Sequence, residues 1–164
     1  MTTPYAGSCC HDNTVVELPL VDRLSKDDMA LWHAWKRAAE TVRARVVEDV
    51  AAATGLSDPD FGVLTRVAED GKGSLRQSRL ADSMGWHRSR LSHHLTRMEQ
   101  RGLVTRRPVD GGVEVVITDA GRAEVARARP VHAAAVRAHL VEPLGKADRA
   151  TFFACLAALA ESRD

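Results

Sequence analysis

Residues 75–107 read LRQSRLADSMGWHRSRLSHHLTRMEQRGLVTRR, and this stretch decides the fold. Its centre, residues 85–102, holds four arginines and three histidines, whereas the aliphatic side chains are Leu91, Leu95 and Met98. In a helix with about 100° between successive residues, these three side chains fall within one narrow arc. The pattern therefore predicts an amphipathic helix whose apolar side packs against a core.

The opposite side of this helix carries hydrogen-bond donors. Ser89, His93 and Arg97 lie nearly opposite the apolar arc. Such side chains suit the major groove of B-DNA, where arginine binds O6 and N7 of guanine and serine or histidine binds single acceptors. His94 falls at the edge of the apolar side, so we expect it to belong to the core. The residues expected to read DNA are Arg88, Ser89, Arg90, His93, Thr96 and Arg97.

The flanking segments complete a winged helix-turn-helix. Residues 77–84 form a short helical pattern that Gly85 ends, so two helices meet across a turn of about four residues. Residues 103–107 and 113–117 are β-branched runs on either side of Asp110-Gly111-Gly112, which predicts a hairpin, the wing. The residues expected to contact phosphates or to lie at the wing are Arg76, Arg79, Arg101, Arg106 and Arg107.

The rest of the chain predicts further helices and a mainly α fold. Residues 26–54 contain no glycine or proline, and a helix of that length spans roughly 43 Å, more than a domain of this size covers. Thr118 caps a helix to about residue 141, with a bend or break expected at Pro130, and a last helix covers about residues 147–162. The expected organisation is an N-terminal arm (1–24), a dimerisation helix (25–56), a winged helix-turn-helix domain (57–118) and C-terminal dimerisation helices (119–164).

Charge is unevenly distributed along the chain. The net charge is +1, but residues 72–107 hold nine basic and two acidic residues, which indicates a polyanionic partner for this segment. The sequence shows no secretory leader and no apolar run long enough to span a membrane, so we expect a cytoplasmic protein. The three cysteines do not suggest a disulfide framework, and we expect Cys155 to be a small buried apolar residue.

Residues 75–107, the following DGG hairpin and the ITDAGR run together resemble the multiple-antibiotic-resistance regulator (MarR) family. The resemblance covers about residues 27–162 and is most specific over 75–122. It implies a winged-helix lobe on a helical dimerisation lobe, and a homodimer on a pseudo-palindromic operator. It also implies repression that a small ligand, an oxidant or a metal relieves. Relatives commonly carry an arginine at the wing tip, and this chain has none there.

Two groups of residues are candidates for sensing a signal. Trp32, His33 and Trp35 either line a pocket for a small aromatic or phenolic effector or belong to the dimer core. The Cys9-Cys10-His11 run is either a redox or metal sensor or an inert tail. We expect no cofactor and no metal site.

Two rival functions bear on the interpretation. An enzyme is not expected, because no nucleophile elbow, phosphate loop, dinucleotide fingerprint or paired metal motif occurs. A winged helix that docks a protein and never binds DNA stays open as an alternative.

Overall fold

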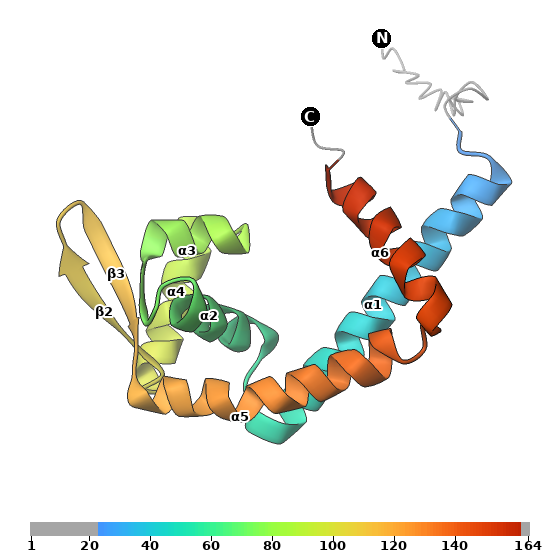
Figure 1. The fold of residues 1–164 in the computed structure, drawn as a ribbon. Coiled ribbons are helices and arrows are strands. Elements are labelled where there is room, and N and C mark those ends of the chain that lie inside the picture. The colour runs from blue at the N-terminus through green and yellow to red at the C-terminus, as the bar shows by residue number, and fades with distance from the viewer. Residues whose placement is uncertain (1–22, 162–164) are drawn as a thin grey trace, which may run out of the picture. The chain divides into compact units, whose positions relative to one another are not determined.

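The computed structural model describes residues 23–161 and is mainly helical, as expected (Figure 1). It divides into two compact units, one ending at Arg37 and the other beginning at Ala38. The boundary falls within the first helix, α1 (Lys26–Thr54). The predictions for Cys9, Cys10 and His11, and for most of the N-terminal arm, lie outside the described residues.

Helix α1 has the bounds that the sequence predicts. At its start, the Asp28 amide donates to Ser25 Oγ at 3.0 Å, which satisfies one of the free amides of the first turn. At its end, Gly55 takes φ +73°, a left-handed conformation that glycine adopts without steric cost. Among the helices that the structure describes, none is both long and apolar enough to cross a membrane.

Three helices belong to the predicted winged helix-turn-helix domain: α2 (Asp58–Glu69), α3 (Gln77–Met84) and α4 (Arg88–Gln100). The helix-turn-helix itself consists of α3 and α4. A reciprocal capping box starts α2, because Asp60 N–H donates to Ser57 Oγ and Ser57 N–H donates to Asp60 Oδ2. Gly85, with φ +62°, ends α3 and turns the chain directly toward α4. The predicted pair of helices across a short turn is therefore confirmed.

The wing is an antiparallel hairpin of β2 (Val104–Val109) and β3 (Gly112–Ile117), in register from Val104 opposite Ile117 to Val109 opposite Gly112. A third strand, β1 (Ser74–Arg76), adds to the sheet in the order β1-β3-β2. The hairpin prediction is confirmed, whereas β1 was not predicted. A segment of three residues is too short to show a periodic pattern. Strand β1 forms because it pairs with β3, which lies about forty residues later in the chain.

The apolar sides of α2, α3 and α4 meet the wing strands in one core. Leu75 of β1 and Val115 of β3 contribute to it, so the short strand also closes the core at the sheet. Such burial is the main favourable term in folding and fixes the side that each helix presents to water. The largest fully buried side chains are Leu56, Leu64, Leu80, Leu91, Leu95, Met98, Val63, Val67, Val104 and Val115.

Helix α5 (Asp119–Val136) starts as expected, with Gly121 N–H donating to Thr118 Oγ1 at 3.0 Å. We expect a bend or a break at Pro130, and the break is wrong, because the helix continues through this residue. Val125 and Ala128 before it and Ala135 after it are buried, and this packing holds the backbone helical on both sides of the exposed proline. The departure from α geometry follows Val136, in the π-helix η2 (Arg137–Val141).

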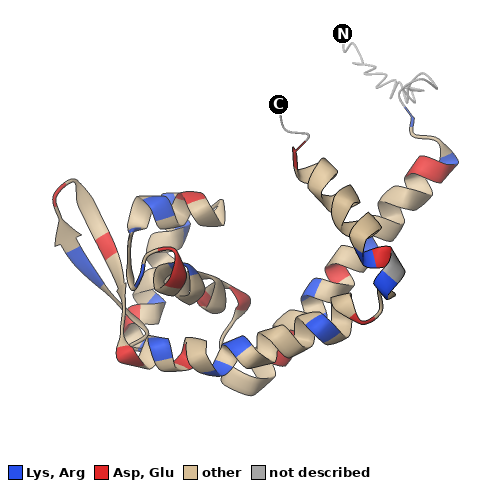
Figure 2. Cartoon of the chain, in the orientation of Figure 1, with Lys and Arg blue, Asp and Glu red and all other residues tan. Residues whose placement is uncertain are grey.

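Helix α6 (Lys146–Glu161) ends the described chain. Charged residues occur at its two ends, whereas residues 150–160 are uncharged (Figure 2). The prediction that Cys155 is buried is wrong, because its side chain is exposed. Phe153 is also 72% exposed. Since uncharged residues occupy every side of this helix, composition alone does not indicate which side is buried.

Candidate nucleic-acid interface

Helix α4 presents one polar side to solvent. Its apolar side chains, Leu91, Leu95 and Met98, are completely buried, so the helix cannot rotate about its axis without exposing them. The His87 side chain caps the helix by accepting from Ser89 N–H. The six residues predicted to read DNA are all exposed and lie on this helix: Arg88, Ser89, Arg90, His93, Thr96 and Arg97.

Two of these arginines are held by contacts within the protein. The Arg97 Nη2 donates to His94 Nδ1 at 3.0 Å. The Arg90 guanidinium lies over the Trp86 ring, 4.2 Å from the ring centroid, in a cation–π contact. Both guanidinium groups keep further donors, because an arginine carries five N–H bonds. The surface of α4 is therefore partly ordered before any ligand binds.

Two arginines of the wing fix the position of the hairpin. One binds side chains of α4, and the other binds the neighbouring strand. Arg106 donates through its backbone N and through Nε to Glu99, at 2.8 and 2.7 Å, and through Nη2 to Thr96 at 3.0 Å. Arg107 is paired with Glu114 of the neighbouring strand. The hydrogen bond from Arg107 holds the pKa of the Glu114 carboxyl below its usual value. Arg106 thus has a structural role that the sequence did not indicate, whereas Arg107 keeps an exposed guanidinium.

The wing tip receives a guanidinium from another strand. Arg76, at the end of β1, donates from Nη1 to the Asp110 carbonyl at 2.6 Å, beside Gly111. The tip itself carries no arginine, so Arg76 brings positive charge to a place where the hairpin supplies none. A surface hollow of about 180 Å³ separates the wing from the starts of α3 and α4, and it is lined by Arg76, Gln77, Ser78, Arg88, Gly111, Gly112 and Val113. The fifth residue expected at phosphates, Arg79, is exposed on α3.

A buried carboxylate joins α2 to α4. Asp60 is 4% exposed, and its Oδ2 accepts from Arg101 Nη1 at 2.6 Å and from Ser57 N–H at 3.1 Å. Burial raises the pKa of this carboxyl, but the hydrogen bonds from Arg101 and Ser57 outweigh it and bring the pKa below its usual value. Arg101, which we expected at phosphates, thus binds the buried carboxylate through Nη1, while its side chain stays 46% exposed. The S-x-x-D spacing of Ser57 and Asp60 marks the helix start, but nothing in it indicates the buried pair with Arg101.

His94 lies against the same carboxylate and is 7% exposed, which confirms its assignment to the core. Its Nε2 is 3.2 Å from Asp60 Oδ1, and the Trp86 ring meets it edge-on. Burial lowers the pKa of His94. The Asp60 carboxylate raises it, but the positive charges of Arg97, Arg101 and Arg90 lower it further, so the pKa lies below the usual value. The ring is therefore neutral at pH 7.

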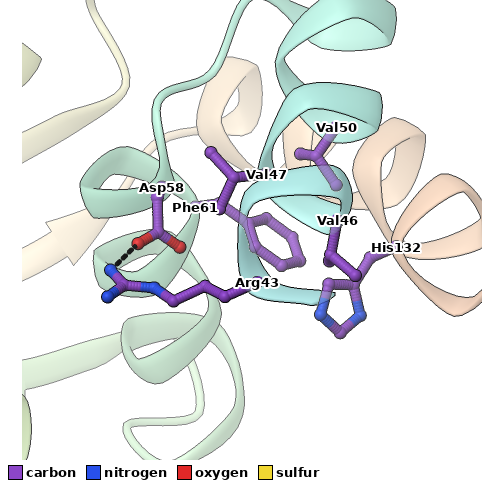
Figure 3. Close-up of a pocket in the computed structure, with 7 residues that line it drawn as sticks. All are labelled: Arg43, Val46, Val47, Val50, Asp58, Phe61 and His132. Carbon is purple, nitrogen blue, oxygen red and sulfur yellow. Dashed lines mark hydrogen bonds and ion pairs between the residues drawn. The ribbon is translucent and has the colours of Figure 1, made fainter. Parts of the chain in front are cut away.

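A cavity of about 210 Å³ opens beside the start of α2 (Figure 3). Its walls are apolar, and at one side Arg43 Nη2 donates to Asp58 Oδ2 at 2.6 Å. The rings of Phe61 and His132 stand 5.2 Å apart in the wall. Trp32, His33 and Trp35 do not line this cavity, and no sequence pattern pointed to the residues that do: Arg43, Val46, Val47, Val50, Asp58, Phe61 and His132.

Helices α3 and α4, the hairpin that follows and the exposed polar side of α4 define a winged helix-turn-helix protein. A model of the MarR family matches residues 54–112. This segment of the chain is a MarR-type winged-helix domain. A search of curated proteins finds no match to it.

Solved structures extend the similarity beyond the winged helix. The MarR family transcriptional regulator AbsC from Streptomyces coelicolor is 28% identical, with a TM-score of 0.77 over 85% of this chain and 95% of that one. Sco3205 from the same organism, solved in complex with DNA, is 26% identical, with a TM-score of 0.77 over 87% and 91%. The transcriptional repressor CouR, bound to p-coumaroyl-CoA, is 29% identical, with a TM-score of 0.69 over 85% and 99%.

The depressed pKa of His94 predicts acid sensitivity. An unfolded chain releases the ring to its usual pKa of about 6.5 and then binds more protons than the native one, so the free energy of unfolding falls as pH drops through that value. Urea denaturation of the wild type and of His94→Gln, from about pH 7.5 to about 5.5 at one chain concentration, measures this effect. The wild-type midpoint should decline more steeply than that of the variant. Parallel profiles would contradict the assignment.

Proposed function

We propose that this chain is a sequence-specific double-stranded DNA-binding regulator, a homodimeric repressor that places α4 in the major groove of a pseudo-palindromic operator. One observation carries the proposal: α4 exposes six polar or basic side chains on one side while its apolar side is locked in the core. That arrangement matches a recognition helix, which presents donors to base edges. No carboxylate stands among those six residues to repel phosphates.

The contacts divide between bases and phosphates. Arg97 and Arg90 project from α4 with their guanidinium groups already oriented, which suits recognition of guanine. Arg76 and Arg88 border the hollow between the wing and α4, where a phosphodiester strand leaving the major groove would pass. Arg76 also puts a cation at the wing tip, so the wing need not carry one of its own.

Two relatives support this proposal. Sco3205 was solved in complex with DNA, and CouR is a transcriptional repressor that was solved with an aromatic thioester ligand. Both cover more than nine-tenths of their own length in the match to this chain. Repression and the binding of a small molecule are carried over from CouR as part of the proposal, and release from DNA by that molecule is our own addition to it.

DNA binding is tested on duplexes selected by the wild-type chain from a random pool. Affinity should fall by about three to five decades between about 50 and 200 mM salt, because Lys and Arg contacts release counterions. Arg97→Ala should cost ~1–3 kcal/mol at one base position. Arg79→Ala is the matched control and should weaken binding to all sequences alike. If the wild type ignores duplexes even in dilute salt, a protein-docking role replaces this one.

Exposed apolar side chains support the homodimer. Leu31 is 71% and Trp32 50% exposed in α1, and Phe153 is 72% exposed in α6. Large apolar groups at such exposure are typical of surfaces that a partner covers. One recognition helix reads only a few base pairs, whereas a two-fold dimer with helices about 34 Å apart reads two half-sites. A second copy of this chain would cover the exposed apolar side chains and would also supply the second recognition helix.

The dimer predicts a solution mass of twice the 17.9 kDa of one chain, measured by light scattering. Phe153→Glu should shift the mass toward the monomer and weaken operator binding, because it places a charge in an apolar interface. Ser83→Glu, at an exposed position of α3 outside both expected dimerisation segments, adds the same charge and should leave the dimer intact. A monomeric wild type, or a Phe153→Glu chain that remains dimeric, would contradict this interface.

The cavity beside α2 is the proposed effector site. Its apolar walls suit an aromatic ring, and Arg43 at one side can bind a carboxylate in place of Asp58. Both charged side chains are partly exposed, so their ion pair costs little to exchange. The cavity is smaller than usual drug-sized sites, which favours a compact aromatic acid or phenol.

Calorimetric titration with benzoate and 4-hydroxybenzoate tests this site. Either acid should bind the wild type and lower its affinity for the selected duplex. Arg43→Ala should lose most of the binding, since the carboxylate loses its cation. Arg45→Ala, an exposed neighbour outside the cavity, should retain it. Equal binding by both variants, or none by the wild type, would exclude the site.

A further inference from the structure

The guanidinium of Arg97 is tied to a buried ring. Arg97 Nη2 and His94 Nδ1 are 3.0 Å apart. Arginine has donors and no acceptor, so Nδ1 must accept this hydrogen bond with its lone pair. A neutral ring whose Nδ1 is unprotonated carries its hydrogen on Nε2. The contact with Arg97 therefore determines which tautomer of His94 the structure requires.

On the other side of the His94 ring, the Asp60 carboxylate favours the same tautomer. Nε2 lies 3.2 Å from Asp60 Oδ1, at electrostatic contact distance, but the two atoms form no hydrogen bond. A carboxylate oxygen only accepts, so it favours hydrogen on Nε2. Asp60 cannot swing away easily, because its Oδ2 is bound by Arg101 and by the Ser57 amide. The ring thus lies against a fixed carboxylate of α2 while it accepts from Arg97 on the exposed side of α4.

This chain of contacts has a consequence for recognition. A free arginine side chain populates many rotamers and loses that freedom when it binds a base pair. We propose that His94, held by Asp60, is a positioning residue that aims the Arg97 guanidinium at one base pair of the operator. The proposal rests on the proposed DNA-binding function. It assigns sequence discrimination to a residue that is buried and touches no DNA.

The charges around His94 keep the ring able to accept. The groups facing it are Asp60 from α2, Arg90 and Arg97 from α4, and Arg101 at the end of α4. Three guanidinium groups against one carboxylate, together with burial, favour the neutral ring. Protonation would place hydrogen on Nδ1, and Arg97 would lose its acceptor.

Base discrimination in four variants tests the proposal. The position that Arg97 reads is the one relaxed in Arg97→Ala, by about 5- to 150-fold. His94→Met, apolar and of similar size, should lose most of this preference while keeping its affinity for non-specific duplex. His94→Gln should retain it, because the amide can accept from Arg97 and donate to Asp60. The double variant His94→Met with Arg97→Ala should lose nothing further at that position.

Two outcomes overturn the inference alone: His94→Met keeping the wild-type preference, or weakening binding to all duplexes equally. A wild type that binds no duplex overturns the inference and the proposed function together. Circular dichroism establishes that each variant is folded.

Two further measurements keep the inference falsifiable if His94→Met does not fold. The wild-type preference at the Arg97 position should decline from about pH 7.5 to about pH 5, and that of His94→Gln should stay flat. Both chains retain His87 and His93, so a shared decline would overturn the inference. Nitrogen-15 spectra of the free protein at pH 7.5 should show His94 protonated on Nε2, and an Nδ1–H tautomer would equally overturn it.

Discussion

The burial of Leu91, Leu95 and Met98 is the constraint on which the rest of this structure depends. A helix that hides three side chains along one side has no rotational freedom left, so its opposite side is presented to solvent in one orientation. Every later feature uses that orientation: the exposed donors of α4, the brace from Arg106 and the contact between Arg97 and His94. Large-to-small changes in this apolar stripe would therefore disturb recognition through geometry as well as stability.

Polar contacts around Asp60 add specific positions for side chains to the packing that hydrophobic burial produces. Asp60 is buried with two donors, Arg101 and the Ser57 amide, and removing the Arg101 guanidinium would leave the buried carboxylate without its cation. The same turn of α2 carries Asp58 and Phe61, which line the cavity. A ligand in that cavity thus lies within one helical turn of the carboxylate that holds His94. The proposed effector site and the proposed reading surface are joined by contiguous contacts.

Most of the fold was predictable because its signals are local. The bounds of α1, the helix cap at Thr118, the stop at Gly85 and the Asp110-Gly111 turn each depend on residues within a few positions. The two elements that failed depend on distant residues. Strand β1 exists because β3 pairs with it, and α5 continues through Pro130 because buried alanines hold it on both sides. The exposure of Cys155 has a similar origin, since no local pattern selects the buried side of an uncharged helix.

By itself the sequence determined which helix has a polar side, which residues lie on it and that a hairpin follows, because 3.6-residue periodicity and turn chemistry are written in short stretches. Only the tertiary structure decided what those residues do for one another. It placed Arg76 at the wing tip, engaged Arg101 with Asp60 and set His94 beneath Arg97. These partners come from different elements. A side chain with several rotatable bonds can adopt many rotamers, so its contact partner is determined only when the surrounding elements are packed.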